Sequence, residues 1–310
     1  MGLILLAALL YMSGVERILS EISKADMGLL FLVLATSFSL MYMRAFRWKT
    51  LLENIGIRLE MKKLFPVFIS GLFISNITPA KTGDPFRSYL LKRKAGIEFS
   101  KSFPSVVMER VLDISIVVLL SLTGLFFIRV SDLLFFSSVA LIVFYATAIL
   151  TVVHISASRG RILWFSRHVY NLFKWVPRIK VLEKRIESMA TVFNNSFLRF
   201  GNKRILLGAF SISLPIWILE SFGLYLAMEA FGLKADIIAA AFALTIGLLV
   251  GIASSLPGGL GSTDSTMAFI ISATLPAPLP MATAAVLVHR LLTTWLTIFV
   301  GAAFLSLEAK

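Results

Sequence analysis

The chain has 310 residues, of which 58% are hydrophobic and 15% are charged, and its mean hydropathy is +0.88. Soluble domains carry about 25% charged residues, so this composition excludes an ordinary soluble protein. The net charge of +13 could suit nucleic acid. However, the basic residues lie in loops that flank apolar runs, as the positive-inside rule predicts for membrane proteins, and we expect no nucleic-acid partner. The absence of Cys excludes thiolate metal sites, and three scattered His make a structural metal unfavourable, so no cofactor is expected.

Apolar runs long enough to cross a bilayer recur along the chain, because a spanning helix needs about 20 apolar residues. Six full spans are predicted, at residues 3–19, 27–46, 105–128, 133–155, 205–231 and 281–305. The first lacks the basic amino-terminal region of a cleavable signal peptide. The predicted fold is therefore all-α, a polytopic helical integral membrane protein.

Two further apolar segments are interrupted by proline or glycine. Residues 64–78 are too short to cross upright and stop at Pro79. Residues 237–256 stop at Pro257, and a short arm at 262–275 follows. We predict that both segments are broken or re-entrant, although hydropathy alone also allows eight or nine full spans.

The remaining segments are predicted to lie at the membrane surface. Residues 44–49 have the aromatic and basic composition of an interface anchor. Residues 84–101 are amphipathic and basic, which is typical of a segment in the headgroup region. The basic stretch 156–203 is predicted to form two surface helices divided by Pro177, as a solvated linker.

The two broken segments belong to a pattern that repeats at an offset of 180 residues. The matched pairs are Asp84 and Asp264, Arg110 and Arg290, Gly71 and Gly251, and Ser75 and Ser255. Interrupted segments at corresponding places in two halves are typical of transporters whose site lies between the repeats. We predict one transmembrane domain, with halves at about 27–156 and 204–308 and a cytoplasmic linker at about 157–203.

Charge placement predicts the orientation. Residues 44–63, 81–101 and 159–204 hold 23 of the 30 Lys and Arg. If the broken segments are re-entrant, these stretches and both termini are predicted to be cytoplasmic, and the halves are inverted. The predicted location is the cell membrane.

Ionisable residues inside spans cost at least about 2.5–3.5 kcal/mol at mid-helix, so they are candidates for function. They are Glu109, Arg110, Asp113, Glu220, His289 and Arg290. Internal salt bridges are one interpretation, with Asp84 or Glu109 for Arg110 and Asp264 for Arg290. A headgroup site in which Arg binds phosphate is the other. Glu220 and His289 are expected only to bond to a neighbouring helix.

Broken backbone at membrane depth survives only if it is buried in protein or lines a wet cavity. A helix that begins after such a break points its positive end at that cavity, where an anion can bind. An ordinary loop is the alternative. The predicted substrate-binding residues are Asp84, Arg87, Glu109, Arg110, Asp113, Pro257, Gly258, Gly259, Gly261, Asp264 and Arg290. No catalytic motif is present, and no enzymatic activity is expected.

The same stretches resemble the lysylphosphatidylglycerol synthase transmembrane, or flippase-like, family. Gly83-Asp84-Pro85-Phe86-Arg87 and Glu109-Arg110-Val111-Leu112-Asp113 are similar to its Gly-Glu-x-x-Arg and Glu-Arg-x-x-Asp blocks. Leu256-Pro257-Gly258-Gly259-Leu260-Gly261 and His289-Arg290-Leu291 are similar to its Pro-Gly-x-x-Gly and Arg blocks. The resemblance implies a relative of the lipid-flipping half of the multiple peptide resistance factor. Membrane lipids, anionic or polyprenyl-linked, would be its partners.

Two departures bear on that expectation. Asp84 and Asp264 stand where the family usually has Glu, which shortens the reach of each carboxylate. No soluble aminoacyl-transfer domain is evident after Leu305, so the chain is not expected to synthesise lysyl-lipid. Two alternatives stay open, a membrane enzyme or accessory subunit acting on a polyprenyl-phosphate lipid, and an ion-coupled carrier of a small solute.

Overall fold

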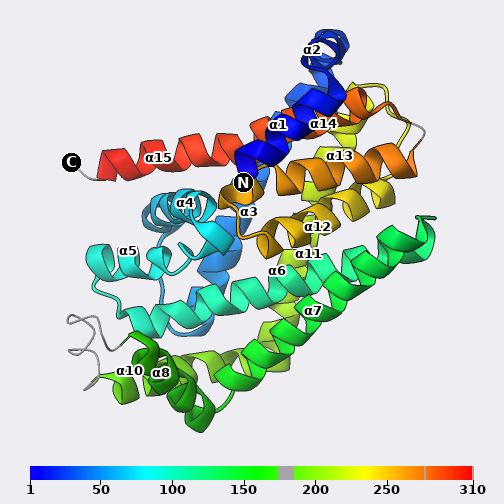
Figure 1. Ribbon diagram of the computed structural model, residues 1–310. Helices are drawn as coiled ribbons and strands as arrows, with labels where there is room; N and C mark the ends of the chain where they lie inside the picture. Colours follow the sequence, from blue (N-terminus) through cyan, green and yellow to red (C-terminus); the bar gives the residue numbers. More distant parts are fainter. Residues whose placement is uncertain (174–184, 276, 309–310) are drawn as a thin grey trace.

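The computed structural model describes residues 1–173, 185–275 and 277–308. Within these ranges the chain forms helices joined by short turns and contains no strand (Figure 1). Several helices are long and apolar enough to cross a bilayer. The prediction of an all-α, polytopic membrane protein is therefore confirmed.

The helices and helical turns follow in a single order along the chain. They are α1 (Gly2–Ser13), α2 (Val15–Lys24), α3 (Met27–Asn54), α4 (Met61–Ile77), η1 (Pro79–Lys81), α5 (Phe86–Ala95), α6 (Phe99–Phe127), α7 (Asp132–Ser156), α8 (Arg159–Phe173), α10 (Ile186–Leu198), η3 (Arg199–Gly201), α11 (Lys203–Ala230), α12 (Ile237–Ala253), η4 (Pro257–Gly259), α13 (Ser262–Thr274), α14 (Leu279–Arg290), η5 (Leu291–Trp295) and α15 (Leu296–Glu308). The turn η5 is a π-helical segment inside the last span.

Five segments of the described chain have the length and composition of full spans. They are α3, α6, α7, α11 and the run Leu279–Leu307 through α14, η5 and α15. The predicted first span differs, because α1 and α2 meet at an angle of 75° at Gly14. At 1.5 Å per residue, the apolar α1 is about 18 Å long, too short to cross a core of about 30 Å alone.

The amino end of the described chain lies near the centre of the molecule (Figure 1). Gly2 packs there against Leu260, directly after the turn η4. The side of the membrane that each terminus faces therefore stays a prediction.

Both predicted breaks are present, and each has the same construction. A helix of 17 residues, α4 or α12, ends before a proline-led turn, and a shorter helix follows it. The backbone has positive φ at Ala80 and Lys81 in the first turn and at Gly258 and Gly259 in the second. The two turns, η1 and η4, pack against each other.

The elements from α3 to α6 have counterparts in the same order after the linker, from α11 to the last span, whereas α7 has none among the described elements. The helices α3 and α11 each have 28 residues, and α6 and the run Leu279–Leu307 each have 29. The packing is reciprocal, since α4 of the first half contacts α15 of the second and α12 contacts α6. These matches support the predicted repeat, and the inversion of its halves stays a prediction.

The predicted interface anchor at residues 44–49 is wrong. Helix α3 continues to Asn54, so Arg44 and Arg47 lie within a long helix and not at its end. Arg47 and Trp48 are 1% and 0% exposed. Met41, Ala45, Trp48 and Leu52 recur at spacings of four, three and four and are all buried, which is the pattern of a helix face packed in a core.

The surface predictions for 84–101 and 156–203 hold only in part. Helix α5 buries Arg87 and Ser88 on its inner face, although its last turn is basic. Helix α10 buries Phe193 and Phe197 and packs against α6, so it is more than a solvated linker. Pro177 lies outside the described residues.

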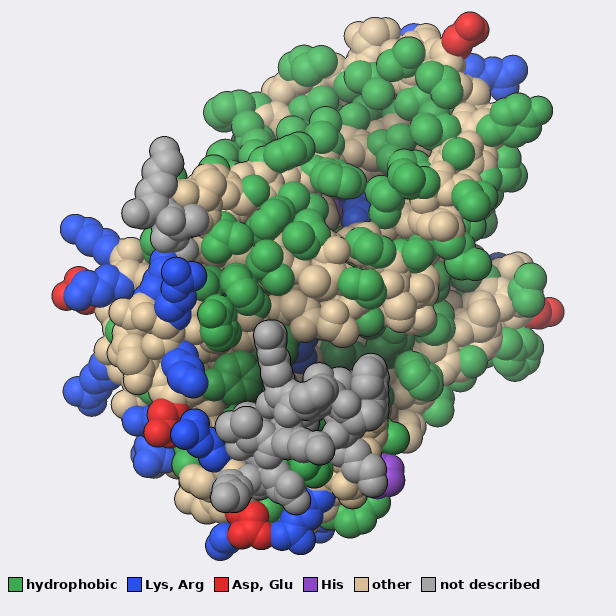
Figure 2. Space-filling view, turned by 60° about the vertical axis from the view of Figure 1, so that its left-hand side comes forward, with side chains coloured by type: hydrophobic (Ala, Val, Ile, Leu, Met, Phe, Trp, Pro, Cys, Tyr) green, Lys and Arg blue, Asp and Glu red, His purple; other side chains and the backbone are tan. Residues whose placement is uncertain are grey.

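Charge on the surface follows the predicted asymmetry. Figure 2 shows Lys and Arg side chains gathered toward one end of the molecule, while hydrophobic side chains cover most of the rest of that face. The apolar band and the basic end are the features that the positive-inside rule uses to assign the cytoplasmic side.

This asymmetry generates a test by cysteine labelling, because the native chain has no Cys. Ser188 is exposed on α10, and Lys234 is exposed in the turn that joins α11 to α12 at the opposite end of α11. In intact cells, a membrane-impermeant maleimide should label Lys234→Cys and not Ser188→Cys. Labelling of Ser188→Cys from outside would reverse the predicted orientation.

Candidate functional site

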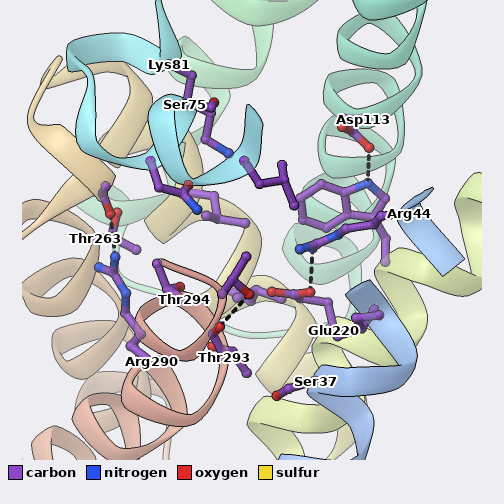
Figure 3. Close-up of a pocket in the computed structure, with 18 of the residues that line it drawn as sticks. Ser37, Arg44, Ser75, Lys81, Asp113, Glu220, Thr263, Arg290, Thr293 and Thr294 are labelled. Atoms are coloured by element: carbon purple, nitrogen blue, oxygen red, sulfur yellow. Dashed lines mark hydrogen bonds and ion pairs between the residues drawn. The ribbon is translucent and has the colours of Figure 1, made fainter. Parts of the chain in front are cut away.

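A polar cavity of about 110 Å³ lies where the two breaks meet, between α3, α6, α11 and the last span. It is lined by Ser37, Leu40, Arg44, Arg47, Leu72, Ser75, Asn76, Lys81, Glu109, Arg110, Asp113, Trp217, Glu220, Leu244, Leu248, Gly258, Thr263, Met267, His289, Arg290, Thr293, Thr294 and Thr297. The segments beside the breaks that contribute to this wall are α4, η1, α12, η4 and α13. Figure 3 shows Arg290 on one side, the pair of Arg44 and Glu220 on the other, and Lys81 beside Ser75 at a third.

The first half contributes the predicted pair of Asp84 and Arg110. Arg110 contacts both carboxylate oxygens of Asp84, through Nε and, at 2.8 Å, through Nη2. The Ser75 hydroxyl donates to Asp84 Oδ1 at 2.6 Å. Because Asp84 directly precedes α5, its carboxylate lies at the positive end of that helix.

Arg110 also links this pair to a second group of charges that is almost fully buried. Arg110 Nη1 lies 3.3 Å from Asp113, and Arg47 binds Asp113 at 2.6 Å and Glu109 at 3.0 Å. Arg87 binds the other oxygen of Glu109 at 3.0 Å. Arg47 and Glu109 are 1% and 2% exposed in their side chains, so their hydrogen bonds replace water.

The second half contributes the predicted pair of Asp264 and Arg290, which are 3.0 Å apart. Asp264 also accepts from the backbone N–H of Gly261 at 2.7 Å, so it caps α13 with its own carboxylate. Arg290 donates in addition to the carbonyl oxygens of Gly258 and Gly259. The carboxylate of Asp264 therefore lies in the first turn of α13, at its positive end, and the predicted binding of an anion at this helix end stays a prediction.

The matched glycines mark close approach between the two arms of each break. A Cβ on Gly71 would overlap Cγ of Arg87, and one on Gly251 would overlap Oγ1 of Thr263. Only a residue without a side chain lets the returning arm approach so closely. Ser75 and Ser255 are not equivalent, since Ser254, not Ser255, bonds to the second arm, through Ser262 at 2.8 Å.

The eleven predicted site residues fall into three groups. Glu109, Arg110, Asp113, Gly258 and Arg290 line the cavity. Asp84 and Asp264 lie directly behind the two cavity arginines and bind them. Arg87, Pro257, Gly259 and Gly261 do not line it; Arg87 lies over the rings of Trp48 and Phe68, each 5.1 Å away. Their role in binding a substrate stays a prediction.

Sequence reasoning missed Arg44, Arg47 and Lys81 as site residues. Arg44 binds Glu220 at 2.6 Å across α3 and α11, which confirms that Glu220 bonds to a neighbouring helix. The helical spacing of Met41, Ala45, Trp48 and Leu52 could have revealed the first two. Lys81 carried no such signal, since its placement depends on the turn η1.

His289 behaves differently from the prediction. Its ring is 1% exposed and lines the cavity, yet neither ring nitrogen has a hydrogen-bond partner among the described residues. Buried polar atoms nearly always have a partner, in protein or in water. The ring nitrogens of His289 therefore differ from the arginines and carboxylates of the site, each of which is paired within the protein.

The charges around the cavity do not balance. Its wall and the layer behind it contain six basic side chains, Arg44, Arg47, Lys81, Arg87, Arg110 and Arg290, and five carboxylates, Asp84, Glu109, Asp113, Glu220 and Asp264. Each arginine binds at least one of these carboxylates. Lys81 has no ion-pair partner within the described ranges, so one positive charge is left over. No group of three or more potential metal ligands occurs in those ranges.

Comparisons with known proteins agree with this architecture. The family model described as Lysylphosphatidylglycerol synthase TM region matches residues 1–301. The chain is similar to a UPF0104 membrane protein of Methanothermobacter thermautotrophicus, with 27% identity over 97% of this chain and 92% of the relative. UPF0104 membrane proteins of Methanocaldococcus jannaschii and Pyrococcus horikoshii are 26% and 23% identical, over 96% and 97% of this chain and 90% and 93% of theirs.

Close approach at Gly71 predicts that Gly71→Ala is destabilising. Arg87 is fully buried and cannot move aside freely, and overpacking of this kind costs about 1–3 kcal/mol. Gly208→Ala is the matched control, because nothing lies within 4 Å of that position on α11. Thermal unfolding in detergent, followed by tryptophan fluorescence, should show a lower midpoint for Gly71→Ala only. Equal midpoints would contradict the close approach.

The second pair predicts a stability effect that a partner change can reverse. Arg290→Ala leaves the buried carboxylate of Asp264 without its counter-charge and should cost about 3–5 kcal/mol. Adding Asp264→Asn removes the charge and should restore most of the stability, except for the lost bonds to the Gly258 and Gly259 carbonyls. Arg167→Ala, in the exposed pair with Glu187, should cost no more than about 1 kcal/mol. A double variant as unstable as Arg290→Ala alone would show that the unpaired charge of Asp264 does not cause the loss of stability.

Proposed function

The chain belongs to the lysylphosphatidylglycerol synthase transmembrane family, and we propose that it binds an anionic phospholipid or polyprenyl-linked lipid and moves it between leaflets. The observation that carries the proposal is the charged cavity at the junction of the two breaks. It holds an excess of one positive charge and lies among helices of membrane-spanning length. Such a cavity suits an anionic headgroup on its way across the apolar core.

The cost of the charges supports a functional role. Ionisable groups within spans are expensive, and a bundle held together by apolar packing alone has no need of this many. Arg47, Arg87 and Glu109 are each at most 2% exposed, and could be replaced by apolar side chains if they served only stability. Arginine is also the side chain best suited to bidentate binding of phosphate.

Reciprocal packing of the halves suggests how movement could occur. The broken segment of each half packs against a long apolar segment of the other, α4 against α15 and α12 against α6, and η1 and η4 meet between them. Rocking of one half against the other would expose the cavity to each side in turn, as in transporters built from repeats. Short ion-paired contacts such as Arg44 with Glu220 are the interactions that would break and re-form.

The two alternative functions, a membrane enzyme acting on a polyprenyl-phosphate lipid and an ion-coupled carrier of a small solute, would require different groups in the site. An enzyme acting on a polyprenyl phosphate needs an acid or base at the reacting atoms, and here all five carboxylates are already bound by arginines, which leaves only Lys81 and His289 among the described cavity residues for that role. An ion-coupled solute carrier needs a group that binds and releases the ion. His289 faces the cavity, but its burial beside the positive charge of Arg290 disfavours its protonation, so it does not favour the carrier.

The proposal is tested in proteoliposomes of phosphatidylcholine that contain fluorescent phosphatidylglycerol. Protein-dependent loss of fluorescence to an impermeant reductant measures lipid movement across the bilayer. Arg290→Ala with Asp264→Asn should fold but lose at least about tenfold in rate, because tenfold corresponds to only 1.4 kcal/mol of headgroup binding. Arg167→Gln, at an exposed pair, should retain the native rate. A native protein no faster than empty liposomes would refute the proposal, as would a double variant of native rate.

A further inference from the structure

Two apolar hollows on the membrane-facing side join into one groove beside α6. The first, of about 480 Å³, lies between α6, α7, α8 and α10. The second, of about 470 Å³, lies between η1, α6 and α7. Both are lined by Phe103, Val107 and Val152, so they are adjoining parts of a continuous groove. We call it the α6–α7 groove.

The end of the α6–α7 groove that lies at η1 adjoins the charged cavity. Lys81 and Arg110 line both the groove and the cavity, so these two side chains form the boundary between an apolar and a polar compartment. Arg110 is held by Asp84 and Asp113, whereas Lys81 has no ion-pair partner among the described residues. A phosphate that entered at this boundary would find one basic group already free.

The groove is an apolar surface that packing inside the protein does not use. Between Arg110 and the helices α8 and α10, the groove is lined mostly by phenylalanine and aliphatic side chains. Helix α7, which forms one of its walls, is the least buried of the five spans. Along α6 the groove extends from Phe99 to Ile114, which at 1.5 Å per residue is about 22 Å. One leaflet of the apolar core is about 15 Å thick, so the groove can hold a whole acyl chain.

We propose that the α6–α7 groove binds one acyl chain of an anionic phospholipid whose phosphate is held by Lys81, with Arg110 beside it. The inference rests on the proposed function and deepens it, because it assigns the lateral portal through which the lipid reaches the cavity.

The bound lipid would have an unusual direction. Its phosphate would lie at Lys81, beside Arg110, which is more than a third of the way along α6 from Phe99. Its acyl chain would run from there back toward α8 and α10, at the basic end of the molecule. A lipid resting in the leaflet at that end has the opposite direction, with its headgroup at the surface. The groove therefore fits a lipid whose headgroup has already turned inward, which is an intermediate of movement between leaflets.

The test uses the full chain in phosphatidylcholine nanodiscs and a phosphatidylglycerol probe with a diazirine near the end of one acyl chain. After illumination, peptide mass spectrometry should find the label on groove residues such as Val152, Ile162 and Phe165. A phosphatidylcholine probe with the same chain should label these residues at least about fivefold less. Equal labelling by both probes would mean that bulk lipid merely wets the surface, and would overturn the inference.

Variants separate the phosphate contact from the chain contact. Lys81→Gln should lower groove labelling at least fivefold, and Lys81→Arg should restore it. Ala148→Trp fills the groove and should also lower labelling, whereas Val143→Trp, on the exposed side of α7 and outside both hollows, should not. Groove labelling at the native level in both Lys81→Gln and Ala148→Trp would also overturn the inference.

The lipid-movement assay in parallel distinguishes this inference from the proposed function. A labelled groove in a protein that moves no lipid would leave the binding site standing and remove the transport. Movement of lipid without groove labelling would leave the transport standing and place the portal elsewhere.

Discussion

The structure depends on the rule that a helix cannot be broken inside the apolar core of a membrane unless its freed backbone groups find partners within the protein. Here the second break finds such partners in side chains of its own half. The turns η1 and η4 pack together, and Arg290 donates to the two carbonyl oxygens that the second turn leaves free. Asp264 accepts the N–H of Gly261 at the start of the next helix. Because Arg290 and Asp264 also bind each other, one ion pair satisfies both edges of a break.

The charged side chains that lie at the breaks also form the candidate site. Each returning helix begins beside a carboxylate, Asp84 or Asp264, and each carboxylate recruits an arginine from the next long helix. The first half extends this arrangement into a buried network through Asp113 and Arg47. Every carboxylate of this network is paired with an arginine, and Lys81 is the basic residue that remains. The excess charge thus lies where the cavity meets the apolar groove, and it is the basis of the anion binding that we propose.

The ion pair of each half could be proposed from the sequence, because its two residues are close along the chain. Asp84 and Arg110, like Asp264 and Arg290, are joined by one short helix and one turn, so their spacing of 26 residues almost fixes their meeting. Gly71 and Gly251 were visible as matched positions, although their role in close approach was not. Arg47 was misplaced because basic and aromatic residues after an apolar run usually mark the end of a span. In this chain the buried apolar face continues for two more turns, and Trp48 belongs to the core.

The sequence by itself determined the helical membrane class and the two breaks, because these follow from hydropathy, proline and glycine. It also predicted the pair of Asp264 and Arg290, and it narrowed the partner of Arg110 to Asp84 or Glu109. Only the tertiary structure decided that α3 carries Arg44 and Arg47 into the cavity, that Asp264 accepts the N–H of Gly261 at the start of α13, and that α1 and α2 form a bent pair. It alone joined two hollows beside α6 to the cavity at Lys81. The first and last of these features arise from contacts between segments far apart in the chain, whose geometry no local pattern contains.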